Sequence, residues 1–217
     1  MVIIVALLAL IVLIVYWSLK VDCDFTLAIR ERLGIDLYDL KGRIVWITGA
    51  SSGIGAELAV QLAAARAKIV LSARNETGLN AVRDRCYSAG HVATDDVLVV
   101  PLDITDQSAH QAALDKVTGH FGKVDVLVNN AGRALVSKFV DITSEQDQSL
   151  FATNLLGPIG LTRLVVKHWL SKSHRGQLVV VSSLSGRITA PMNATYAGTK
   201  HALHGYFDAL RNEVNSV

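Results

Sequence analysis

Short runs of β-branched and aliphatic residues alternate with longer helix-like stretches along most of this chain of 217 residues. The runs are apolar at nearly every position, which indicates strands that are buried on both faces of a sheet. Strands that alternate with helices are typical of a parallel sheet covered by helices on both sides. Because such crossovers are right-handed, the sequence predicts a doubly wound α/β domain with strand order 3-2-1-4-5.

The alternation predicts five strands and five helices. The expected strands are 43–48, 68–72, 97–102, 124–129 and 177–182. The expected helices are 53–66, 76–89, 106–121, 144–170 and 196 to about 214.

The N-terminal segment differs in composition from the rest of the chain. Residues 1–19 contain no charged side chain, and the run ends in Tyr16 and Trp17, followed by Lys20. At about 1.5 Å per residue, a helix of this length just crosses a bilayer core of about 30 Å. Aromatic and basic residues at its end are typical of a membrane interface. We expect a single-pass transmembrane helix over 1–20; a cleaved signal peptide or a buried core helix are the alternatives.

Residues 21–41 are expected to form a juxtamembrane linker, or a short amphipathic helix on the membrane surface. The doubly wound α/β domain is then expected over 42–217. The 21 basic and 19 acidic residues are spread along the chain without a basic block, which gives nucleic-acid binding no support. Cys23 and Cys86 are far apart and the seven histidines are scattered, so neither a disulfide framework nor a metal site is predicted.

A glycine-rich turn follows the first predicted strand. Residues 48–55 read TGASSGIG and lead directly into a predicted helix. Glycines allow a tight turn and close approach of a phosphate, whose charge the helix N-terminus favours. The turn therefore predicts a nucleotide site, although such a turn alone is often only a turn.

Tyr196 and Lys200 are four residues apart on the last predicted helix, so they share one face. A phenol is ordinarily a weak acid, with a pKa of about 10, and a nearby ammonium favours its ionised form. This spacing suits acid–base chemistry; the alternative is a pair on an exposed surface.

Together, these motifs resemble those of the short-chain dehydrogenase/reductase family, and the resemblance covers residues 42–217. It rests on four motifs in order, which are TGASSGIG at 48–55, Asp103 after the third strand, Asn-Asn-Ala-Gly at 129–132, and Ser183 with Tyr196-x-x-x-Lys200. The resemblance implies a Rossmann-like fold and hydride transfer between a nicotinamide and a carbonyl or alcohol.

The resemblance also implies a role for each matching residue. Tyr196 would be the general acid in reduction and the base in oxidation, and Lys200 would tune it and hold the nicotinamide ribose. Ser183 would orient the substrate oxygen, or it caps the turn that follows; Asn154 would hold a water of a proton relay, or it marks a local kink. The expected cofactor contacts are Gly49, Ser51, Ser52, Gly53, Ile54, Gly55, Arg74, Asp103, Asn130, Ala131, Gly132, Tyr196 and Lys200.

The residues after the second strand bear on the choice of cofactor. An NAD site usually has a carboxylate there for the ribose 2′-hydroxyl, whereas this chain has Arg74 followed by Asn75. A guanidinium pairs well with a 2′-phosphate. We therefore expect NADP(H).

The N-terminal run, the sequence Val-Leu-Ser-Ala-Arg at 70–74 and the stretch after Lys200 are similar to membrane-anchored members of the family. That similarity implies a lipophilic substrate such as a steroid or retinoid, an endoplasmic reticulum membrane location and possible homodimers. The alternative is a truncated, catalytically inactive nucleotide-binding membrane protein. Family members continue past the position of Val217 with strands 6 and 7 and a substrate-covering loop. Without them we expect an exposed fifth strand and little activity from this chain alone.

Overall fold

The computed structural model describes residues 7–8, 10–14, 40–89 and 92–214. The chain divides into two units, Met1–Asp39 and Leu40–Val217. In the first unit, residues 7, 8 and 10–14 are helical, and their aliphatic side chains are between 54% and 65% exposed. The rest of the expected transmembrane helix, and the expected linker as far as Asp39, lie outside the described residues.

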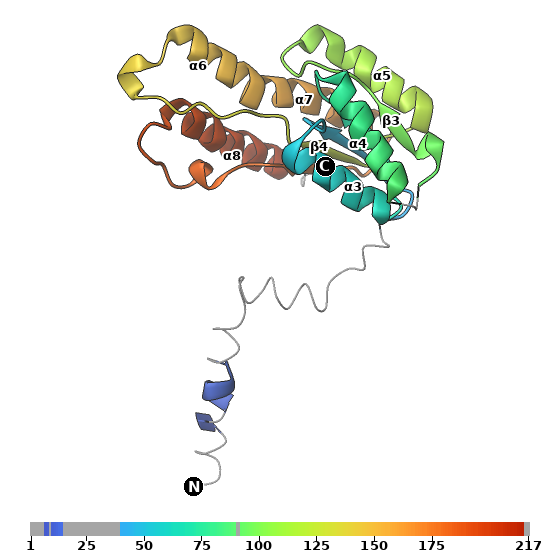
Figure 1. The fold of residues 1–217 in the computed structure, drawn as a ribbon, viewed down its shortest axis with the longest axis horizontal. Helices are drawn as coiled ribbons and strands as arrows, with labels where there is room; N and C mark the ends of the chain where they lie inside the picture. The colour runs from blue at the N-terminus through green and yellow to red at the C-terminus, as the bar shows by residue number, and fades with distance from the viewer. Residues whose placement is uncertain (1–6, 9, 15–39, 90–91, 215–217) are drawn as a thin grey trace. The chain divides into compact units, whose positions relative to one another are not determined.

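The second unit is built on a five-stranded parallel sheet (Figure 1). Its strand order, β3-β2-β1-β4-β5, confirms the predicted order. The strands are β1 (Ile44–Thr48), β2 (Lys68–Ser72), β3 (Val97–Val99), β4 (Val126–Asn129) and β5 (Gln177–Val180).

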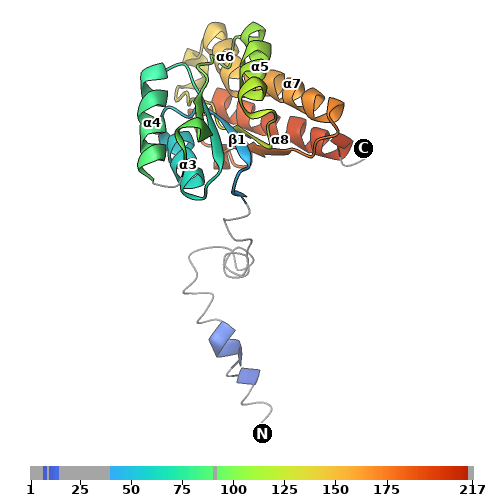
Figure 2. The same ribbon diagram turned by 90° about the vertical axis from the view of Figure 1, so that its right-hand side faces the viewer.

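Helices cover both faces of the sheet (Figure 2). On one face lie α3 (Gly53–Ala64) and α4 (Glu76–Ser88), and on the other lie α5 (His110–Phe121) and α7 (Gly157–Ser171). Alternate residues of β1 supply the two cores, since Val45 and Ile47 pack on the first face and Ile44 and Trp46 on the second. Burial of every β1 side chain explains its continuous apolar run.

The remaining elements are shorter or lie beyond the sheet. The 3-10 turns are η2 (Thr94–Asp96), η3 (Gln107–Ala109), η4 (Phe139–Asp141) and η6 (Leu184–Gly186). The other helical segments are α6 (Ser144–Phe151), the π-helical η5 (Ala152–Leu156) and α8 (Ala194–Val214).

Two predicted strands extend too far toward their C-terminal ends. β3 ends at Val99 rather than at residue 102, because Pro101 has no N–H to donate to the neighbouring strand. The adjoining backbone still follows β2, as Val100 N donates to Leu71 O and Leu102 N to Ala73 O. β5 likewise ends at Val180 rather than at residue 182.

The single helix predicted over 144–170 is three segments, α6, η5 and α7. Among the described residues, this stretch alone has the length and mean hydropathy of a membrane span, but half of its most apolar part is buried inside the domain. Such burial is what a core helix shows.

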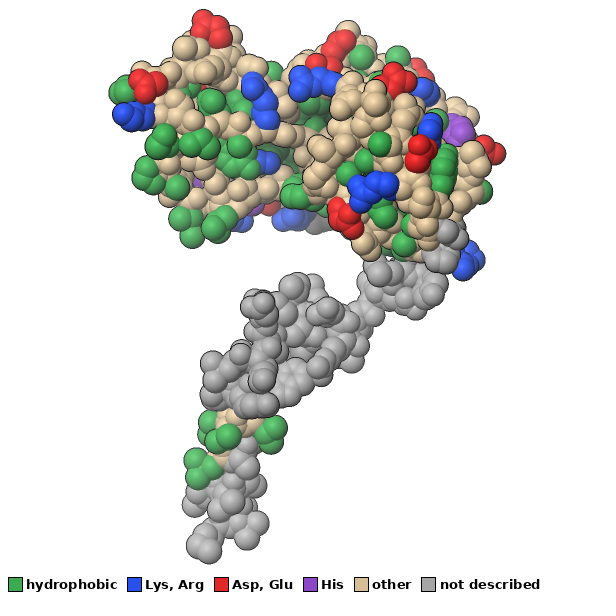
Figure 3. Space-filling model, viewed as in Figure 1, with side chains coloured by type: hydrophobic (Ala, Val, Ile, Leu, Met, Phe, Trp, Pro, Cys, Tyr) green, Lys and Arg blue, Asp and Glu red, His purple; other side chains and the backbone are tan. Residues whose placement is uncertain are grey.

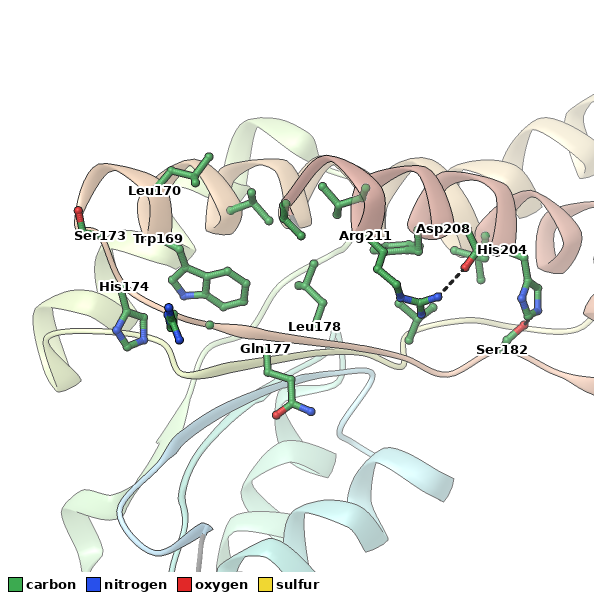
Figure 4. A pocket seen from close by; sticks show the side chains of 18 residues that line it. Trp169, Leu170, Ser173, His174, Gln177, Leu178, Ser182, His204, Asp208 and Arg211 are labelled. Atoms are coloured by element: carbon green, nitrogen blue, oxygen red, sulfur yellow. Dashed lines mark hydrogen bonds and ion pairs between the residues drawn. The ribbon is translucent and has the colours of Figure 1, made fainter. Parts of the chain in front are cut away.

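No described strand pairs with the outer edge of β5, and the β5 residues are only partly buried. A groove of about 1030 Å³ runs along this edge between β5, α7 and α8. Figure 4 shows its lining, with Leu178 between the strand and the two helices.

A buried carboxylate ties the N-terminal ends of three strands together. Asp125 Oδ2 accepts a hydrogen bond from Ile44 N at 2.9 Å, and Oδ1 lies 2.8 Å from Lys123 Nζ and 3.1 Å from His174 Nε2. Burial alone would raise the pKa of Asp125, but the Ile44 N–H and the Lys123 ammonium outweigh it and hold this pKa below its usual value. The charged form is therefore favoured by the fold.

We expect Asp125→Asn to lower the free energy of unfolding by about 1–3 kcal/mol at neutral pH, since a charge-assisted hydrogen bond is lost. The difference in the free energy of unfolding between wild type and variant is fully present above about pH 4, the ordinary pKa of an aspartate. It is lost as pH falls through the lower pKa that Asp125 has in the folded state. Urea unfolding at several pH values, followed by tryptophan fluorescence, measures the loss of stability and its dependence on pH. Asp84→Asn, on the surface, serves as the control. A difference that persists unchanged in acid would contradict this assignment.

Candidate active site

The turn between β1 and α3 is packed against the end of β4. Gly49 has a φ of +65°, and a Cβ there would lie 2.7 Å from Ala131 Cα. A Cβ on Gly55 would lie 2.5 Å from Asn130 Nδ2. Because no larger residue fits at either position, the sequence needs glycine at both.

The first turn of α3 points its backbone N–H groups toward the space beside this loop. The N-cap residue, Ser52, forms no side-chain capping bond, so its hydroxyl does not satisfy these N–H groups. A helix N-terminus of this kind carries a partial positive charge and binds phosphate well. The local structure therefore fits the diphosphate of a dinucleotide.

Thr48 and Asn130 hold the two strand ends together. Thr48 Oγ1 accepts hydrogen bonds from Asn130 N and Ala131 N, both at 3.1 Å, and donates to Val128 O. Asn130 Nδ2 donates to Thr48 O at 3.0 Å and to Gly49 O at 3.1 Å. The glycine loop and the Asn-Asn-Ala-Gly motif thus form one hydrogen-bonded unit.

A cavity of about 750 Å³ opens at the carboxyl ends of the strands. Its volume is in the range of small-molecule and cofactor sites, roughly 300–1,000 Å³. It is lined by every expected cofactor contact except Gly55, which is buried beneath Asn130. The expected residues that line it are Gly49, Ser51, Ser52, Gly53, Ile54, Arg74, Asp103, Asn130, Ala131, Gly132, Tyr196 and Lys200.

One end of the cavity carries Arg74 and Asp103. The Arg74 side chain is exposed and forms no hydrogen bond or ion pair with the described part of the chain. Asp103 Oδ1 accepts from Thr105 N at 2.9 Å and from Thr105 Oγ1 at 2.8 Å. The Thr105 backbone bond, with help from the Arg74 charge, holds the pKa of Asp103 below its usual value. A guanidinium therefore remains available at this end for an anionic group.

The other end of the cavity carries Tyr196 and Lys200. Lys200 is 5% exposed, and its Nζ lies 5.6 Å from the Tyr196 ring centroid and donates to Val181 O at 3.0 Å. Burial lowers the pKa of Lys200. The predicted pair thus lines the cavity and does not lie on an exposed surface, which removes that alternative.

Asn154 lies behind the cavity in the π-helical η5. Its Oδ1 accepts from Arg133 N and its Nδ2 donates to Arg133 O, both at 2.9 Å, and Nδ2 also reaches Thr199 Oγ1 at 3.2 Å. The amide therefore fixes the loop after Gly132, and the helix widens at this residue. The structure shows the local distortion named as an alternative for Asn154; a role in holding water stays a prediction.

Ser183 is placed differently from the expectation. It is the N-cap of η6, where its Oγ accepts from Ser185 N at 3.1 Å, and it is not among the residues that line the cavity. Ser182, one residue earlier, lines the cavity. The turn-capping role is therefore present, and a role in orienting substrate stays a prediction.

Other residues that line the cavity were not predicted; near the Tyr196 end they are Arg133, Ala134, Thr153, Val181 and Ser182. Each lies within two residues of a predicted site residue, so closeness in the sequence to a motif was the available signal. In the described part of the chain, no group of three metal-ligating side chains comes together.

Comparisons with known proteins place the chain in a family. The family model for short chain dehydrogenase matches residues 43–217. The chain is 41% identical over 197 residues to human dehydrogenase/reductase SDR family member 7, covering 90% of this chain and 58% of that protein. It therefore spans under two thirds of that relative's length.

Solved structures of similar fold include two described with a nicotinamide cofactor. A metagenomic short-chain oxidoreductase in complex with NADP has a TM-score of 0.75 and 30% identity, covering 82% of this chain and 78% of that one. A short chain dehydrogenase/reductase from Burkholderia phymatum in complex with NAD has a TM-score of 0.76 and 26% identity, covering 82% and 62%. With its sheet order, its cavity and a family match that extends over nearly the whole second unit, this chain belongs to the short-chain dehydrogenase/reductase family.

Proposed function

We propose that the protein is an NADP(H)-dependent oxidoreductase that interconverts a lipophilic carbonyl compound and its alcohol. One observation carries the proposal, namely that the buried Lys200 and Tyr196 lie at one end of a dinucleotide-sized cavity. Arg74, whose side chain is exposed, lies at the other end. This arrangement provides an acid–base group and a cofactor site in one cavity.

In reduction, the Tyr196 hydroxyl gives its proton to the carbonyl oxygen while the carbonyl carbon gains a hydride, and in oxidation both transfers reverse. When bound, the nicotinamide supplies or accepts that hydride. The Lys200 ammonium stabilises the ionised phenol and holds the ribose of the cofactor. Ser183 orients the substrate oxygen, and Asn154 holds a water that returns the proton.

The preference for NADP(H) is proposed from the residues after β2. Arg74 occupies the position where an NAD site commonly has a carboxylate, and its guanidinium is exposed and unpaired within the described chain. A bidentate pair with a 2′-phosphate would satisfy it.

The lipophilic substrate is proposed from exposed side chains beyond the Tyr196 end. Ser137 N donates to Met192 O at 3.0 Å, so the loop after β4 and the loop before α8 lie side by side. Figure 3 shows hydrophobic side chains gathered over this region, between α6 and α8. The exposed apolar residues of the two loops are Val136, Phe139, Val140, Leu184, Ile188 and Met192. A group of exposed apolar side chains beside a polar cavity suits the binding of an apolar ligand.

We extend the proposal to the location of the protein. Residues 1–20 anchor it in a membrane, which we propose to be that of the endoplasmic reticulum, residues 21–41 link the anchor to the domain, and 42–217 carry the site. The exposed helical residues Leu7, Leu8 and 10–14 suit contact with lipid. A homodimer is proposed because η5 and α8, which pack together, expose Leu156 and Tyr206.

Tyr196→Phe in the natural full-length protein is expected to lower turnover of a carbonyl substrate by at least about 100-fold, the low end for a positioned acid–base group. NADPH affinity should change little, because the ring is retained. Tyr206→Phe, on the exposed side of the same helix, is the matched control. Near-normal turnover of the Tyr196 variant would exclude this residue as the acid, and binding of NADPH without turnover in the unmodified protein would favour the inactive alternative.

Arg74→Ala is expected to weaken NADPH binding by about 1.5–3 kcal/mol, the range for a hydrogen bond to a charged group. NADH binding should change little, because NADH lacks the 2′-phosphate. Titration calorimetry with both cofactors measures the difference, with Arg83→Ala on α4 as the control. Equal losses for NADPH and NADH would show that Arg74 does not contact the 2′-phosphate.

A further inference from the structure

A hydrogen bond joins the end of β5 to α8 next to the active site. Ser182 Oγ and His204 Nε2 are 3.0 Å apart and partly buried. In Figure 4 the two side chains point toward each other from the strand side and from the helix. The proposed reaction does not use His204.

This hydrogen bond is the second of two between the same elements. Lys200, one helical turn before His204, donates from Nζ to Val181 O at 3.0 Å. Two successive residues of the strand end, Val181 and Ser182, are thus held by two residues on one face of α8. Both strand residues line the cofactor cavity, next to Tyr196 and Lys200.

Gly186 makes room for the pair. A Cβ on Gly186 would lie 2.7 Å from His204 Nε2 and 2.9 Å from Ser182 Oγ. Any side chain there would push the imidazole and the hydroxyl apart. The backbone of η6 therefore closes over the hydrogen bond, and Gly186 N donates to Ser183 O at 2.9 Å.

We propose that His204 is a positioning residue for the reaction. Through Ser182 it fixes the strand end that carries the carbonyl acceptor of Lys200 and leads into Ser183. Without this hydrogen bond, the Val181 carbonyl and the cavity wall at Ser182 are free to move away from α8, and the Lys200 ammonium loses its fixed distance to Tyr196. The inference rests on the proposed function, because it assigns His204 to the nicotinamide end of that same site.

The test compares two amides of different reach in the natural full-length protein. The Nε2 of a glutamine takes nearly the place of His Nε2, so His204→Gln can keep the bond to Ser182. The Nδ2 of an asparagine takes the place of His Nδ1 and falls short, so His204→Asn cannot. Both replacements are neutral and polar, which makes them a matched pair.

We expect His204→Asn to lower kcat about tenfold, the size of one neutral hydrogen bond, and His204→Gln to recover most of that loss. The urea unfolding midpoint should change little in either variant. In a double-mutant cycle, His204→Asn should have little further effect once Ser182→Ala is present, since the two residues act as one unit.

A wild-type kcat in His204→Asn would overturn the inference, and so would equal losses in the Asn and Gln variants. A loss of kcat that follows a lowered unfolding midpoint would show that His204 only stabilises the fold. A second readout is the fluorescence of bound NADPH, which reports the surroundings of the nicotinamide without turnover. If the unmodified protein binds NADPH but reduces no carbonyl, the proposed function fails. In that case a change in the emission of bound NADPH in His204→Asn, but not in His204→Gln, would still support the positioning role of His204. Unchanged emission in His204→Asn would contradict it.

Discussion

The hydrogen bonds between Thr48 and Asn130 hold the structure of the site together. They join the ends of β1 and β4, the neighbouring strands on either side of the point where the strand order reverses. A crevice forms at such a point in any doubly wound sheet. The same bonds fix Gly49 and the start of α3. The glycine-rich turn and the Asn-Asn-Ala-Gly segment are therefore held in a fixed position relative to each other.

The other half of the site depends on contacts between helices and strand ends. Asn154 pairs with both backbone groups of Arg133, and Lys200 holds the end of β5 through Val181. A buried ammonium is costly to the fold, and this cost supports the proposal that Lys200 serves the chemistry of the site and not packing alone. Tyr196 is positioned by α8, the helix that also carries Lys200.

Periodicity predicted the sheet order, and the motifs that resemble those of the family predicted most of the residues that line the cavity. β2 was predicted to the residue, since its apolar run of Ile69 to Leu71 lies between polar residues at Lys68 and Ser72. Contacts between distant residues could not be predicted in this way. The π-helical turn at Asn154 arises from its pairing with Arg133, 21 residues away, and the Ser182–His204 bond spans 22 residues. Capping by Ser183 was foreseen only as an alternative, because a serine at a strand end suits either role.

We propose hydride transfer between a nicotinamide and a carbonyl carbon as the reaction of this protein. The most direct measurement supplies the natural full-length protein with NADPH deuterated at C4 and a lipophilic ketone, and analyses the product by mass spectrometry. We expect an alcohol that carries deuterium on its carbinol carbon when one of the two C4 positions is labelled, and none on that carbon when the label is in the solvent. Binding of NADPH without labelled alcohol from a broad panel of ketones would contradict it.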